Sequence, residues 1–128
     1  MLEPIPKEIS DVVRRLASAG VVWRFAELRH PGRESTWKNF DGLTPGDCEQ
    51  LTEYHVRRAG RALFRFDVTG SLHTAKTAAE HIYRARLYRA KFHDLLGTDQ
   101  AERDQPFPIL SQAEARVISQ EQEARGDA

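Results

Sequence analysis

The sequence predicts a mainly α-helical fold: a small bundle of three to four helices, with a short β-hairpin at about residues 21–40. Apolar residues recur at helical spacing in three segments, proline and glycine mark the ends of those segments, and strand-like alternation is brief. The chain of 128 residues has the size of one domain, and its composition, 40% hydrophobic and 30% charged, is typical of globular proteins. We therefore expect one folded unit built mostly from helices.

The first helix is expected near the N-terminus, before Gly20. Pro4 and Pro6 suit a helix start because the fixed φ of proline fits the first turn, and glycine suits a helix end. One helical face collects Ile5, Ile9, Val12, Val13 and Leu16. Arg14 and Arg15 lie off that face, so we expect both in solvent.

Residues 21–40 predict the hairpin. In an extended chain Val21, Trp23 and Phe25 share one side, HPGRES has the composition of a turn, and TWKNF forms the second strand. A helical continuation is the alternative, because so short a stretch fits either period. Trp23 and Trp37 are expected to anchor the core here, and one left exposed would be a binding hot spot.

A long helix is expected over residues 44–66. Thr44 can cap it, Pro45 suits the first helical position, and Asp47 suits the positive end of the helix dipole. Its apolar face contains Cys48, Leu51, His55, Ala59, Ala62, Leu63 and Phe66, and its opposite face contains Tyr54, Arg57, Arg58, Arg61 and Arg65. The stretch ALFRFDV also alternates like a strand, but we favour the helix.

A third helix is expected over residues 71–96, with Ser71 as its cap and Gly97 as its stop. Its apolar stripe contains Leu72, Ala75, Ala79, Ile82, Tyr83, Leu87 and Ala90. The alanines permit close approach of a neighbouring helix. Since only a short VTG turn precedes it, the two long helices should form an antiparallel pair with the first helix packed across them.

Charge is strongly segregated along a chain whose formal net charge is zero. Residues 1–53 carry a net −2, residues 54–93 a net +7 and residues 94–128 a net −5. We expect a helical domain over residues 1–97, followed over residues 98–128 by an extended connector and an acidic C-terminal helix or tail. A basic block therefore lies inside a neutral protein.

This basic block supplies the candidate partner-binding site: Tyr54, Arg57, Arg58, Arg61, Arg65, Arg84, Tyr88, Arg89 and Lys91. The arginine fork suits phosphates and carboxylates, and tyrosines suit stacking on bases. We expect the cations of two neighbouring helices to form one outward platform. In the alternative interpretation they form an ordinary solvated surface, because Glu53 can pair with Arg57 and the acidic tail can neutralise the rest.

Catalytic and metal-binding signatures are not found in the sequence. The histidines lack metal-ligand spacing, and no phosphate-binding glycine loop or nucleophile elbow occurs. His55 is expected to be a core or interface histidine, and Cys48 a small buried hydrophobe. With no signal-peptide layout and no bilayer-length apolar run, we expect a cytoplasmic, non-membrane protein that is not an enzyme and needs no cofactor or metal.

The predicted function is that of a small, non-enzymatic binding protein that docks its arginine-rich helical face onto an acidic protein or nucleoprotein. By analogy with short, motif-free chains of phages and mobile elements, it would act as an inhibitor or regulator. One alternative is a direct DNA- or RNA-binding protein, although dedicated nucleic-acid binders are usually basic overall. The other is a helical homo-oligomeric assembly subunit, for instance a homodimer.

Overall fold

The structure is a computed structural model that describes residues 5–99. Its elements are α1 (Lys7–Ser18), β1 (Phe25–Leu28), β2 (Thr36–Asn39), a single 3-10 turn (Phe40–Gly42), α2 (Pro45–Thr69) and α3 (Leu72–Leu96). The predicted helical bundle with a short hairpin is confirmed, and the helical alternative for residues 21–40 is wrong. The predicted connector and acidic tail lie, from residue 100 onward, outside the described residues.

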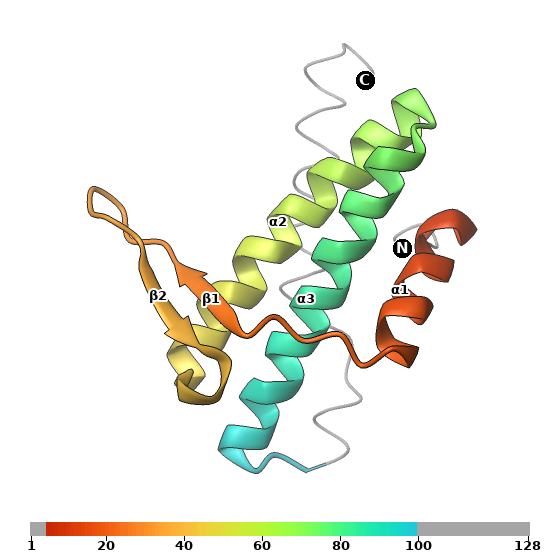
Figure 1. Ribbon diagram of the computed structural model, residues 1–128. Coiled ribbons are helices and arrows are strands. Elements are labelled where there is room, and N and C mark those ends of the chain that lie inside the picture. Colours follow the sequence, from red (N-terminus) through yellow and green to blue (C-terminus); the bar gives the residue numbers. More distant parts are fainter. Residues whose placement is uncertain (1–4, 100–128) are drawn as a thin grey trace.

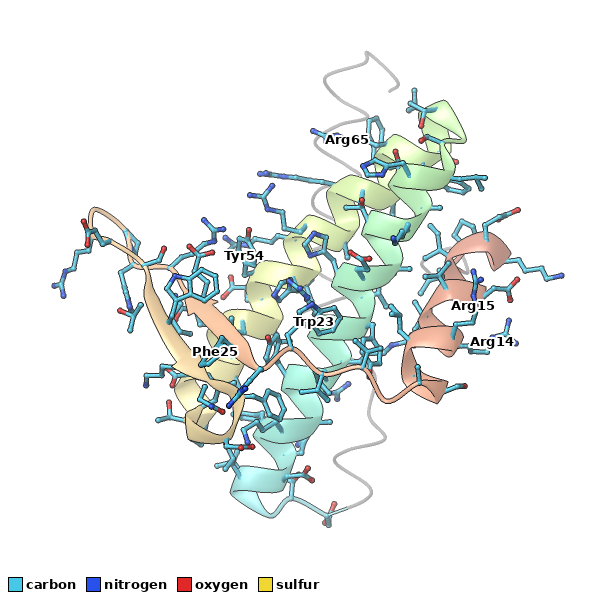
Figure 2. The ribbon with its side chains drawn as sticks, viewed as in Figure 1. Arg14, Arg15, Trp23, Phe25, Tyr54 and Arg65 are labelled. Carbon is cyan, nitrogen blue, oxygen red and sulfur yellow. The ribbon has the colours of Figure 1, made fainter. Side chains whose placement is uncertain are left out.

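The two long helices, α2 and α3, lie side by side and antiparallel (Figure 1). The first helix, α1, packs against α3, while the hairpin lies on the other side, beside the first half of α2 (Figure 1). Arg14 and Arg15 project from α1 on the side away from the hairpin, and both are exposed as predicted (Figure 2). Among residues 5–99, no helix is long and apolar enough to cross a membrane.

The ends of α2 and α3 are set by Thr44, Asp47 and Gly97, as the sequence analysis indicated, and by Gly70, the glycine of the predicted VTG turn. The hydroxyl of Thr44 accepts a hydrogen bond from the backbone N–H of Asp47 at 3.1 Å, and the Asp47 carboxylate accepts one from the N–H of Thr44 at 3.0 Å. This reciprocal capping box satisfies two N–H groups that have no partner within the helix. Gly70 and Gly97 end the two helices with φ of 65°, a left-handed conformation that glycine adopts without strain.

The core has two parts that meet along α2 and α3. The part shared with α1 contains Ile9, Val13, Ala59, Ala62, Ala75, Ala78, Ala79, Ile82 and Tyr83. The part under the hairpin contains Ala26, Leu28, Leu43, Cys48, Leu51 and Tyr88. Alanine dominates the first part, so the long helices approach each other closely there. Cys48 is fully buried as predicted, and this burial raises the pKa of its thiol.

The segment between α1 and β1 crosses the face of α3 (Figure 1). It is held there by Tyr83, whose hydroxyl donates to the carbonyl of Val21 at 2.7 Å, and by the ring of Trp23, 5.9 Å from the Tyr83 ring. Trp23 is therefore a partly buried anchor, as predicted.

The prediction that Trp37 anchors the core is wrong, because its side chain is 64% exposed. Residues of β1 and β2 alternate between the two faces of the hairpin, and the inner face is occupied by Ala26 and Leu28. Trp37 pairs with Glu27 on the other face and therefore points outward. Phe25 shares this outer face and is 53% exposed, so the hairpin presents two aromatic side chains to solvent.

Candidate partner-binding face

Four exposed arginines form a row along the outer side of α2; we call Arg57, Arg58, Arg61 and Arg65 the arginine row. At 100° and 1.5 Å per residue they fall within a sector of about 100° and span about 12 Å of the helix. Among the described residues, Arg57 alone of the four has a carboxylate partner, Glu53. Tyr54 and Arg65 lie toward opposite ends of this row (Figure 2). Three guanidinium groups on one side of α2 are therefore not neutralised within this part of the chain.

Tyr54 lies at the edge of the arginine row, and its ring is already covered by cations. The guanidinium carbon of Arg29 lies 4.8 Å from the ring centroid, and that of Arg58 lies 5.3 Å from it. Such cation–π contacts orient the planar guanidinium groups. Tyr54 consequently positions two arginines and does not offer a free ring for base stacking.

A hollow of about 170 Å³ separates the arginine row from the hairpin. It is lined by Glu27, Arg29, Gln50, Leu51, Glu53, Tyr54 and Arg57. Its charges are balanced, because Arg29 pairs with Glu27 at 3.2 Å and Arg57 pairs with Glu53. Since Glu27 is also the strand partner of Trp37, the exposed tryptophan and the arginine row lie on opposite sides of this hollow.

Two histidines meet where α2 and α3 face each other. The Nδ1 atoms of His55 and His81 lie 2.9 Å apart, so one ring donates a hydrogen bond and the other accepts it. The two rings stack with centroids 5.2 Å apart, and the ring of Tyr88 stacks on His55 at 5.7 Å. His55 is 5% exposed, which agrees with its predicted place in the core.

Burial, above all, lowers the pKa of both histidines. For His55 the positive charges of His81, Arg84, Arg29 and Arg58 add to this effect, and the pKa falls to about 3. For His81 the added charges are those of Arg84 and Arg58, and the pKa falls to about 4. Both rings are consequently neutral near pH 7, and they sit inside a group of arginines.

The cations of α3 do not point outward as one platform with the arginine row; Arg84 and Lys91 each lie over an aromatic ring of the same chain. The guanidinium carbon of Arg84 lies 4.0 Å from the ring centroid of Trp23, and the ammonium of Lys91 lies 4.5 Å from that of Phe40. Arg84 thus covers a ring of the segment between α1 and β1, and Lys91 covers a ring of the 3-10 turn that follows β2. Both are partly buried, unlike the exposed arginine row.

Two further predicted residues do not join that face. Tyr88 is 2% exposed and packs in the core under the hairpin, so it cannot contact a partner in this structure. Arg89 follows Arg84 by five residues and points about 140° away from it. Its Nε lies 3.2 Å from Nε2 of His93, one turn further along α3. The structure therefore does not bring Arg89 and Tyr88 together with the arginine row.

Arg29, His81 and Trp23 were not singled out as site residues from the sequence. For His81 the sequence contains a pattern that could have indicated its role. The pattern His-x-x-Arg occurs in both long helices, as HVRR at 55–58 and as HIYR at 81–84. Residues three apart share one face of a helix. In an antiparallel pair, two such patterns can place their histidines in contact and their arginines on either side of them.

Comparison of the chain with protein families, with curated proteins and with solved structures finds no match. Within the described part of the chain, no group of three or more His, Cys, Asp or Glu side chains is placed to hold a metal ion. The cationic face of α2 and the histidine pair beside it are thus the features on which a function can be based.

Proposed function

We propose that this chain is a non-enzymatic binding protein that docks the arginine row onto an acidic protein or nucleoprotein partner. The observation that carries the proposal is the row itself: four exposed guanidinium groups on one side of α2, three of them without a carboxylate partner among residues 5–99. Arginine is enriched in protein interfaces because its rigid fork can bind carboxylates with two hydrogen bonds. Docking of this kind would occlude the partner's surface, as an inhibitor or regulator does.

The distribution of aromatic side chains favours a protein partner over direct binding of nucleic acid. Tyr54 is covered by arginines, and Tyr83 and Tyr88 are buried, so the tyrosines near the cations do not offer free faces to bases. The exposed rings belong to Phe25 and Trp37 on the hairpin, across a charge-balanced hollow. An apolar anchor beside an arginine cluster is the usual composition of a protein interface.

Charge reversal tests this proposal. Wild-type protein and an Arg57→Glu, Arg58→Glu, Arg61→Glu, Arg65→Glu variant are used to capture partners from a lysate, with and without nuclease treatment. We expect the variant to lose a protein that the wild type captures in both conditions. The matched control reverses four exposed cations elsewhere, Arg14, Arg15, Lys76 and Arg86, and should capture as the wild type does.

Salt dependence separates the protein partner from nucleic acid. Neutralisation of phosphates makes affinity fall steeply with salt, whereas an interface with an apolar centre gives a shallower slope. Equal capture by the wild type and the row variant would overturn the proposal. Loss of the captured material after nuclease treatment would instead favour direct binding of nucleic acid.

A further inference from the structure

We propose that His55, Arg58, His81 and Arg84, here called the histidine site, bind the dianionic phosphate group of a phosphorylated partner protein. The identity of the partner rests on the proposed function, while the phosphate-binding chemistry rests on the site alone. Each long helix contributes one His-x-x-Arg pattern, and the two histidines are in contact. Each arginine follows its histidine by three residues, about 4.5 Å along the helix axis. Because the helices are antiparallel, the backbones of the two arginines lie on opposite sides of the histidine pair.

The two positive charges of the histidine site, on Arg58 and Arg84, favour binding of a dianion. Arg58 and Arg84 have no carboxylate within 4.0 Å among residues 5–99, whereas the nearby Arg29 is paired with Glu27. Two positive charges therefore flank the two partly desolvated, neutral imidazole rings, and no carboxylate among residues 5–99 neutralises these charges. A phosphate monoester carries a charge of about −1.5 to −2 at pH 7, which matches these two cations. The same charges disfavour a metal cation at the histidine pair.

Contacts with aromatic rings position the guanidinium groups of Arg58 and Arg84. The guanidinium carbon of Arg84 lies over the ring of Trp23 and that of Arg58 over the ring of Tyr54. Among the described residues, no N–H group of either guanidinium has a hydrogen-bond acceptor, so these donors can bind an oxyanion. In the described part of the chain, Nε of Arg84 is the one buried side-chain nitrogen or oxygen without a hydrogen-bond partner. A buried donor of this kind is uncommon in native proteins and marks a site with unused binding capacity.

The histidine pair supplies a further donor. The ring that accepts the Nδ1 hydrogen bond must carry its own proton on Nε2, because a neutral imidazole has one N–H. Among the described residues, neither Nε2 atom has a hydrogen-bond partner. At least one Nε2–H is consequently available, in addition to the two guanidinium groups.

Binding of a dianion should be coupled to proton uptake by the pair. Burial is the main cause that opposes protonation of the two rings. Arg58 from α2 and Arg84 from α3 add to it at both rings, and Arg29, which follows β1, adds to it at His55. A bound dianion offsets these positive charges and therefore raises the histidine pKa values. Sulfate serves as an analogue of phosphate whose charge stays at −2 from pH 7.5 to pH 6. Because only the histidines can take up protons in this range, the affinity of the site for sulfate should rise as the pH falls.

The test follows the histidine ring protons of the whole chain by NMR during titration with inorganic phosphate at constant ionic strength. We expect saturable shifts of the His55 and His81 signals and no comparable shift for the exposed His73. Arg84→Gln and Arg58→Gln should each weaken phosphate binding about ten-fold, the loss of a charge-assisted hydrogen bond. Arg86→Gln removes an equal charge at an exposed position of α3, outside both the histidine site and the arginine row, and should weaken phosphate binding by less than about two-fold.

Binding of two peptides and one oligonucleotide is compared to identify which class of macromolecule supplies the phosphate. An acidic peptide with one phosphoserine should bind more tightly than its unphosphorylated form and more tightly than a 5′-phosphorylated single-stranded oligonucleotide. Tighter binding of the oligonucleotide would overturn the protein assignment. Absence of a saturable histidine shift, or equal weakening by Arg86→Gln and Arg84→Gln, would overturn the site itself. Capture through the arginine row would then persist, so this failure is distinct from failure of the proposed function.

Discussion

At the scale of single residues, the histidine pair couples the stability of the protein to pH. In the unfolded chain each histidine titrates near its ordinary pKa of 6.5, whereas in the folded chain the values are about 3 and about 4. Between these limits the unfolded state binds more protons than the folded state. The free energy of unfolding must therefore rise with pH in this window and fall as the pH drops below about 6.5.

We expect the free energy of unfolding, measured by urea denaturation, to fall by about 4 kcal/mol from pH 7.5 to pH 5, about 2 kcal/mol for each histidine of this pair. Asp47, whose pKa is lowered below 3.8, titrates outside this interval. Its carboxylate is partly desolvated, but the hydrogen bonds from Lys38 and Thr44 outweigh that effect. The His55→Gln, His81→Gln variant should lose most of the slope, and His73→Gln should keep it. A wild-type protein equally stable at both pH values would contradict this prediction.

At the scale of the elements, helix ends could be predicted from the sequence because they depend on local chemistry. A capping hydroxyl at Thr44, Pro45 beside it, and Gly70 and Gly97 act through their own backbone and the next few residues. The helix expected over residues 44–66 continues to Thr69; residues 67–69 are exposed, and the left-handed Gly70 ends the helix. The four-residue strands were harder to predict because short alternating stretches fit both periods.

The capping box gives a prediction for α2. Thr44→Ala removes the acceptor for the N–H of Asp47 and should lower the free energy of unfolding by about 1 kcal/mol. Thermal or urea denaturation at pH 7.5 measures the change. Thr77→Ala is the matched control, because its hydroxyl bonds to a carbonyl within α3 and caps nothing. A loss no larger for Thr44→Ala than for the control would show that the cap is not needed.

The candidate site was only partly predictable, for a physical reason that concerns the register between helices. A helical wheel places Arg57, Arg61 and Arg65 on one side of α2, and the structure agrees. The same wheel cannot say which part of α3 the hairpin covers, and so Tyr88 was expected at the surface but is buried. Nor can it align α2 with α3, which is why the contact between His55 and His81 was not foreseen.

At the scale of the whole molecule, the close approach of α2 and α3 depends on small side chains. Ala79 has no exposed surface, and its neighbours in the core include Ala59, Ala62 and Ala75. Ala79→Leu would insert three carbon atoms into this packed layer and should lower the free energy of unfolding by about 1–3 kcal/mol. Ala90→Leu makes the same change at an exposed position of α3 and should be nearly neutral. Equal stabilities of the two variants would contradict close packing.

The two-residue turn at Gly70 and Ser71 bears on how the chain assembles. The contacts between α2 and α3 can form across this turn with little loss of loop entropy, so they are kinetically favoured. By contrast, α1 packs on α3, which is synthesised more than fifty residues later. During translation the first helix would thus remain exposed as an unpartnered amphipathic segment until residues Ala75 to Tyr83 of α3 had left the ribosome, an interval in which chaperones would have access to it.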